Sequence, residues 1–223
     1  YEISCSLVGS EMCIRDSDEL VYNFRQKAGL PIPQRNERHS YFWTDQLPGS
    51  AAGRFLMGAG GTLRWMDDDA LRARMDSVIN VIEQCKEPDG YLMAYPKSAI
   101  FDFENGAYVR SWVTHGLIEA GYAGNPKAFG LLRDFYDWFE SSPFLPEMLR
   151  RPGQGVQGAI PLTRTYFSPV GKTDEICVMQ RYFQQNYWMD WLKDRNTDAI
   201  WKYPYDRPHN YLVTAVEPYL DLY

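Results

Sequence analysis

The residues best suited to chemistry in this sequence are two of its three histidines. His115 lies in Y-V-R-S-W-V-T-H-G-L-I-E-A-G, residues 108–121, and His209 lies in R-P-H-N-Y-L, residues 207–212. A neutral imidazole donates a hydrogen bond from one ring nitrogen and accepts one at the other, so it can bind a hydroxyl group. For His115 the spacing alone favours a simpler explanation, because a single histidine in a helix usually has a structural role in the protein interior.

The segment that carries His115 has the spacing of a helix. Its apolar side is formed by Trp112, Val113, Leu117 and Ala120. Its polar residues fall outside that side: Arg110, Thr114, His115 and Glu119. One helix is therefore expected to carry both core residues and candidate functional residues.

A short helix is predicted first, with Asp18 as its N-cap and Gly29 at its end. Two longer helices are predicted between it and the His115 segment. The first covers residues 53–65 and is rich in glycine, which suggests close contact between helix backbones. The second follows an acidic cap at residues 67–69 and ends near Pro88. Its apolar residues repeat at helical spacing: Leu71, Met75, Val78, Ile79 and Ile82.

After residue 121 the pattern predicts more helices. Asn125 and Pro126 begin one that continues to Phe139. Residues 149–173 have no helical period and suggest a short hairpin or another ordered loop at the rim of a site. Two further helices are predicted at residues 174–192 and 210–223.

Helices joined alternately by short turns and long loops, without a convincing strand repeat, predict an all-α domain built from helical hairpins. A bundle, a solenoid and a closed toroid all fit this pattern, and each would gather the long loops on one face. A scaffold without any activity fits it as well.

Composition narrows the class of partner. The 223 residues include 29 acidic and 23 basic side chains, for a net charge of -6, which argues against nucleic acid or an anionic membrane surface. A neutral small molecule or a sugar is easier to accommodate. No run of the ~18 apolar residues that span a bilayer is present, and the four cysteines lack the spacing of a zinc site.

The first 17 residues are set aside because residues 3–17 resemble a translated sequencing adapter rather than part of a folded protein. The sequence also stops within a helical pattern. We therefore expect residues 18–223 to be part of a longer protein.

Four stretches of sequence resemble the N-terminal half of the beta-L-arabinofuranosidase-like glycoside hydrolases, the family 127 type of catalytic domain. They are N-F-R-Q-K-A-G-L-P (residues 23–31), I-E-Q-C-K-E-P-D-G-Y-L-M-A-Y-P (82–96), Y-V-R-S-W-V-T-H-G-L-I-E-A-G-Y-A-G-N (108–125) and Y-P-Y-D-R-P-H-N-Y-L (203–212). Their order and spacing also agree with that family, so the resemblance extends over residues 18–223.

The resemblance implies an (α/α)6 barrel, or toroid, which would be incomplete here. It also implies a retaining hydrolase that removes furanosides from chain ends, with a zinc-bound cysteine thiolate as nucleophile and a glutamate as acid/base. In that family these residues lie C-terminal to the part matched here. The family's combination of a glutamate two residues before a cysteine and paired cysteines further on does not occur in this sequence. We therefore expect zinc in the full-length enzyme only, and no catalytic residue, zinc ligand or activity in this chain.

What the resemblance assigns to this chain is part of the sugar-binding pocket. His115 and His209 match two histidines that bind the hydroxyl groups of the sugar in that family. Arg110, Asp206 and Tyr91 are weaker candidates for roles in or behind the pocket, and a structural ion pair explains Arg110 and Asp206 equally well.

Two other functions stay open. One is a metal-independent sugar epimerase or unsaturated-uronide hydrolase with the same toroidal fold. The other is a carbohydrate-binding helical scaffold without catalytic activity. An incomplete ring would also expose apolar helix faces, so we expect the isolated chain to aggregate or to form a molten state.

Overall fold

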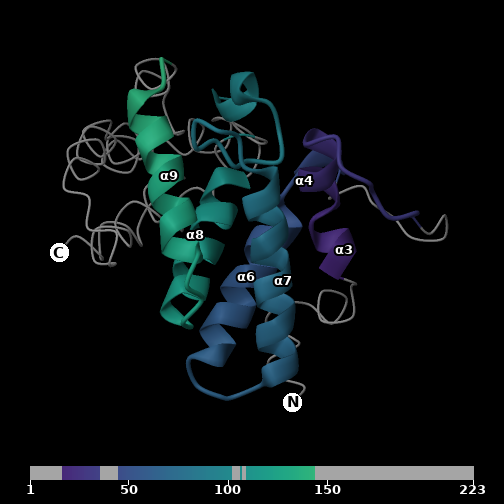
Figure 1. Ribbon diagram of the computed structural model, residues 1–223, viewed down its shortest axis with the longest axis vertical. Helices are drawn as coiled ribbons and strands as arrows, with labels where there is room; N and C mark the ends of the chain where they lie inside the picture. Colours follow the sequence, from purple (N-terminus) through teal and green to yellow (C-terminus); the bar gives the residue numbers. More distant parts are fainter. Residues whose placement is uncertain (1–16, 36–44, 102–105, 107–108, 144–223) are drawn as a thin grey trace, which may run out of the picture. The chain divides into compact units, whose positions relative to one another are not determined.

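The computed structural model describes residues 17–35, 45–101, 106 and 109–143, in which helices and no strand occur. All but Pro143 belong to Tyr1–Ser142, the first of two compact units in the chain. The helices, in order, are α3 (Ser17–Leu20), α4 (Tyr22–Lys27), α6 (Ser50–Leu63), α7 (Asp69–Cys85), the 3-10 helix η1 (Lys97–Phe101), α8 (Val109–Tyr122) and α9 (Ala128–Ser141), as Figure 1 shows. The all-α prediction is confirmed for this part of the chain.

Helices α6 and α8 run parallel and in close contact. A Cβ atom added at Gly53 would lie 2.5 Å from the carbonyl carbon of Trp112, and one added at Gly60 would lie 2.5 Å from that of Glu119. The second contact lies seven residues further along the chain than the first in both helices. The two helix axes therefore run parallel. The prediction that these glycines serve close approach between helices is confirmed.

The return helices α7 and α9 run in the same direction and are linked by polar side chains in and beside them. Asn125 and Lys127, just before α9, donate to Asp76 and Glu83 of α7, and Lys86, just after α7, donates to Asp134 of α9. Contacts also join α7 to α6 and α9 to α8. The four long helices therefore make two layers of parallel helices, which is the arrangement of two successive hairpins in a toroid. It is consistent with the predicted barrel but does not establish a closed ring.

The connections at the two ends of these helices differ in length. Short turns join α6 to α7 and α8 to α9 at one end, whereas residues 86–108 connect α7 to α8 at the other (Figure 1). In the described part of the chain, the long connection thus lies at the end of the helices opposite the short turns. The predicted alternation of short turns and long loops is confirmed there.

Local signals in the sequence were reliable for α7. The Asp68 side chain accepts a hydrogen bond from the backbone N–H of Leu71 at 2.9 Å, which makes Asp68 the predicted cap. The predicted apolar repeat is fully buried at Met75, Val78, Ile79 and Ile82.

The predicted N-cap at Asp18 is wrong. The helix begins at Ser17, so Asp18 lies inside its first turn and instead pairs with Arg25 at 2.8 Å. The short helix is also interrupted at Val21, which divides it into α3 and α4. Leu20, Val21 and Phe24 are buried as expected, and Gly29 follows the helix with a positive φ of 69°.

The predicted division of α8 into an apolar and a polar side needs correction. Arg110 and Thr114 are buried, with 4% and 1% of their surface exposed. The Thr114 hydroxyl donates to the Arg110 carbonyl at 2.8 Å, and the Arg110 guanidinium lies 5.1 Å from the Phe139 ring centroid. Helix α8 packs on both α6 and α9, so most of its circumference is interior.

Several predictions lie outside the described residues: the loop at 149–173, the helices at 174–192 and 210–223, and the candidates Asp206 and His209. Where the structure describes the chain, no helix is both long enough and apolar enough to cross a membrane.

Candidate functional site

His115 lies on the least buried stripe of α8. Trp112, His115 and Glu119 are half-buried and Tyr122 is exposed, whereas the residues between them are largely buried. Positions spaced by three and four residues share one side of a helix. His115 therefore belongs to a polar and aromatic stripe on an otherwise buried helix.

Helix α6 contributes arginines to the same side. The Arg54 guanidinium lies 5.2 Å from the Trp112 ring centroid, and the Arg64 guanidinium lies 5.4 Å from that of Tyr122. Arg64 also donates to Glu119 at 2.9 Å. We call this surface the α6–α8 polar face and define it as Arg54, Arg64, Trp112, His115 and Glu119.

At the centre of the polar face, the Glu119 carboxylate lies between the side chains of His115 and Arg64. Nε2 of His115 lies 3.5 Å from Oε1 of Glu119, and Oε2 of Glu119 accepts from Arg64. The hydrogen bond with His115 is the main reason that the pKa of Glu119 lies below its ordinary value of 4.5. Partial burial opposes this shift, and the Arg64 guanidinium reinforces it. Glu119 is thus a carboxylate at neutral pH, and it fixes one nitrogen of the histidine.

Two weaker candidates occupy interior positions. Arg110 is buried against Phe139, as described above. Tyr91 is fully buried, and its hydroxyl donates to the Tyr95 carbonyl at 2.8 Å. Burial raises the pKa of Tyr91 far above its ordinary value. The structure thus gives both side chains packing roles and places neither on the polar face.

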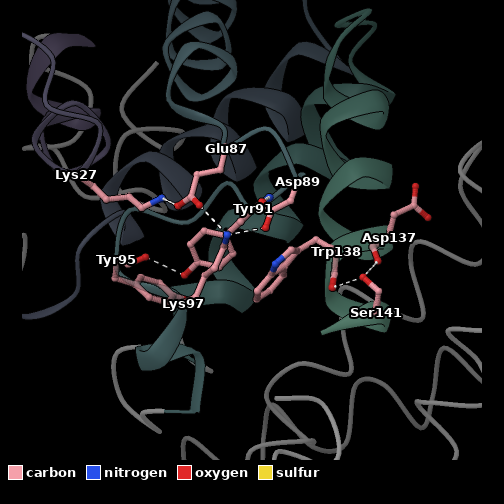
Figure 2. A network of polar contacts seen from close by, with 9 residues as sticks. All are labelled: Lys27, Glu87, Asp89, Tyr91, Tyr95, Lys97, Asp137, Trp138 and Ser141. Atoms are coloured by element: carbon pink, nitrogen blue, oxygen red, sulfur yellow. Dashed lines mark hydrogen bonds and ion pairs between the residues drawn. The ribbon is translucent and has the colours of Figure 1, made fainter. Parts of the chain in front are cut away.

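A separate network surrounds Tyr91 in the connection after α7 (Figure 2). Glu87 pairs with Lys27 from α4 and with Lys97, which also contacts Asp89 at 2.6 Å. The ammonium groups of Lys27 and Lys97 lie 4.7 and 5.5 Å from the Tyr91 ring centroid. Trp138 of α9 packs edge-on against the same ring at 4.5 Å. These contacts fasten the long connection to α4 and α9.

The described residues do not fit a zinc site. No group of three or more His, Cys, Asp or Glu side chains there is placed to hold a metal ion. Glu83 does precede Cys85 by two residues, but Glu83 binds Lys127 at 2.6 Å at the surface. Cys85 is buried, and burial raises the pKa of its thiol above the ordinary value.

Sequence reasoning selected His115 but missed its partners. The i,i+4 spacing of His115 and Glu119 is a local signal that could have identified Glu119. Arg64 is 55 residues from Glu119, so no local pattern links them.

The described residues form a domain of packed helical hairpins with one polar face. Residues 7–157 match the family model described as the beta-L-arabinofuranosidase catalytic domain of GH127, and this match covers more than half of the chain. The protein therefore belongs to the GH127 beta-L-arabinofuranosidase family, which confirms the resemblance. No curated protein and no solved structure gives a significant match.

The matched range differs from the extent predicted for the resemblance. It begins inside the adapter-like segment and ends before Asp206 and His209. It contains His115, Arg110 and Tyr91, together with the whole α6–α8 polar face.

Proposed function

We propose that this chain forms one wall of the sugar-binding pocket of a retaining glycoside hydrolase that removes beta-L-arabinofuranosyl groups from the non-reducing ends of glycans. The observation that carries the proposal is the position of His115. It lies on the polar face of α8, in a chain that belongs to the GH127 family. His115 binds a hydroxyl group of the sugar through its imidazole.

The other predicted residues take different parts in this proposal. For His209 the family resemblance implies a role in sugar binding, and for Asp206 it implies a role in or behind the pocket. Arg110 and Tyr91 are buried, so in this proposal they stabilise the helices by packing and do not contact the sugar.

The catalytic groups are proposed to come from sequence beyond Tyr223. The full-length enzyme would bind zinc, which lowers the pKa of a cysteine thiol and so supplies a thiolate nucleophile at neutral pH. The chain of 223 residues is not expected to hydrolyse glycosides by itself.

Titration of the protein, extended by its downstream sequence, with L-arabinose by calorimetry tests the proposal, with D-arabinose as the control of opposite configuration. We expect binding of L-arabinose that His115→Ala weakens about ten-fold, because one direct hydrogen bond is lost, while the free energy of unfolding changes little. Equal binding by wild type and His115→Ala would contradict the proposal. Loss of the folded state in His115→Ala would instead identify the histidine as a core residue.

A second measurement addresses the zinc-dependent reaction. In the protein extended by its downstream sequence, removal of zinc should stop the release of L-arabinose, and zinc should restore it. Undiminished release of L-arabinose by the metal-free protein would contradict the zinc-thiolate mechanism.

A further inference from the structure

Trp65 is the most exposed large apolar side chain in the described part of the chain, with 88% of its surface accessible to water. It lies in the turn between α6 and α7, at the end of these helices opposite the long connection of residues 86–108 (Figure 1). The backbone N–H groups of Trp65 and Met66 both donate to the Thr62 carbonyl, at 3.0 and 3.1 Å. The exposed indole ring is therefore carried by a hydrogen-bonded turn.

Two further exposed side chains lie beside Trp65. Met66 is its neighbour in the turn, and Tyr122 is the last residue of α8. Both are about as exposed as each other, at 42% and 41%. The Arg64 guanidinium lies 5.4 Å from the Tyr122 ring centroid, which places Tyr122 next to the turn. We call Trp65, Met66 and Tyr122 together the Trp65 patch.

A carboxylate borders the Trp65 patch. The Asp67 side chain is fully exposed and lies 4.0 Å from Arg72. Arg72 also donates to the Ala123 carbonyl at 2.8 Å, so it ties the turn to the end of α8. A carboxylate accepts hydrogen bonds at both oxygens, and hydroxyl groups are suitable donors. The patch therefore combines a flat aromatic surface with an acceptor for hydroxyl groups.

The size and charge of the Trp65 patch restrict its occupant. Its three side chains expose roughly 400 Å², whereas a stable protein interface buries about 800 Å² on each partner. The acidic residues 67–69 beside it and the net charge of -6 disfavour nucleic acid and an anionic membrane. A neutral sugar fits better, because its C–H groups can pack on the indole face and the chain belongs to a glycoside hydrolase family.

We propose that the Trp65 patch is a second carbohydrate-binding surface, which holds a neutral polysaccharide by stacking of a sugar ring on Trp65 and by hydrogen bonds from its hydroxyl groups to Asp67. Tyr122 lies about two turns of α8 beyond His115, so the patch is distinct from the pocket proposed for His115. The choice of a sugar rests on the family and does not require that pocket.

Affinity electrophoresis in gels that contain arabinan, a neutral polymer of L-arabinose, tests the proposal on the protein extended by its downstream sequence. Arabinan should retard wild type, and Trp65→Ala should bind it about five-fold more weakly, because the stacking surface is removed. Ile32→Ala is the matched control, since Ile32 is 45% exposed but aliphatic and lies outside the patch. It should bind like wild type. The anionic polymer polygalacturonate should retard none of the three proteins.

Four results would overturn the proposal. Equal retardation of wild type and Trp65→Ala would show that the indole ring does not bind arabinan. An equal loss in Ile32→Ala would indicate adsorption to any exposed apolar group. A wild-type dimer in light scattering that Trp65→Ala dissociates would identify the patch as an interface between copies of the chain. Identical quenching of wild-type and Trp65→Ala fluorescence by acrylamide would show that the ring is covered in the extended protein.

The patch and the pocket of the proposed function can fail separately. Saturating L-arabinose occupies the pocket and should leave most of the retardation by arabinan in place. Retardation that disappears under these conditions would assign the binding to the pocket and overturn the second surface. If the protein binds no L-arabinose, the proposed function fails, whereas the comparison of wild type with Trp65→Ala still decides the role of Trp65.

Discussion

Gly53 of α6 lies directly against the peptide group of Trp112 on α8. A Cβ atom at Gly53 would lie 2.5 Å from the Trp112 carbonyl carbon and 2.6 Å from its oxygen. Both obstacles are backbone atoms, so no side-chain rotation can relieve the contact. This closeness brings Arg54, the next residue of α6, to the Trp112 ring at 5.2 Å.

We expect Gly53→Ala to destabilise the protein by about 1–3 kcal/mol, because the two helices must move apart to admit a methyl group. Urea unfolding followed by circular dichroism measures the change. Gly61→Ala on the same helix is the matched control, since nothing lies within 4 Å of its added Cβ. It should stabilise the protein by up to about 1 kcal/mol through helix propensity. A Gly53→Ala variant as stable as Gly61→Ala would disprove the close packing of α6 on α8.

The difference between these glycines also shows what the sequence could and could not predict. Glycine-rich composition predicted close helix contact, but it did not distinguish Gly53 from Gly61. The cap at Asp68 and the buried stripe of α7 were predicted because they depend on neighbours within one or two turns.

Burial of Arg110 and Thr114 depends on α6 and α9, and helical period alone placed them on a polar side. The same reason limited the prediction of the site. His115 stood out by residue type, and Glu119 could have been found from its spacing. The contacts of Arg54 and Arg64 exist only because α6 lies beside α8.

Asn125 should be the most sensitive polar residue at the start of α9. Its side-chain oxygen accepts from the backbone N–H groups of Lys127 and Ala128, both at 3.0 Å. Its amide donates to Asp76 at 2.7 Å and so ties α9 to α7. We expect Asn125→Ala to reduce the free energy of unfolding by about 2 kcal/mol, from loss of the hydrogen bonds to the two backbone N–H groups and of the bond to Asp76.

The comparison variant Asn125→Asp retains the acceptor for both N–H groups but places a carboxylate beside Asp76. It should be less stable than wild type at neutral pH and should recover part of that loss in acid. Chemical unfolding of both variants at pH 7 and pH 4 measures the two effects. Wild-type stability in Asn125→Ala would show that the bonds of Asn125 are not needed.

The stability contributed by Glu87 should depend on pH. Partial desolvation raises the pKa of Glu87, but hydrogen bonds from Lys27 and Lys97 outweigh it and hold the pKa below the ordinary 4.5. A carboxylate whose pKa is lower in the folded state stabilises that state above its unfolded pKa, and the contribution is lost as pH falls through the folded value.

We therefore expect wild type to be more stable than Glu87→Gln at pH 7, with a difference that shrinks below about pH 4.5 as the carboxylate takes up a proton. The difference should stay below about 1 kcal/mol and decrease in high salt, because the Glu87 side chain is 35% exposed. Unfolding free energies at pH 7, 5 and 3 test this. A difference that grows in acid would contradict the assigned ion pairs.

Tyr91 offers a test that separates a packing role from the predicted role in or behind the sugar pocket. Its hydroxyl donates to the Tyr95 carbonyl, and its ring lies between Lys27, Lys97 and Trp138. Tyr91→Phe keeps the ring contacts and removes only the hydrogen bond. We expect a loss of about 1 kcal/mol in the free energy of unfolding, independent of pH between 3 and 7, and an unchanged affinity for L-arabinose. Tyr95→Phe, which loses a buried bond to the Gly106 carbonyl at 2.8 Å, is the matched variant and should behave alike. Weaker sugar binding in Tyr91→Phe alone would instead connect this hydroxyl to the pocket.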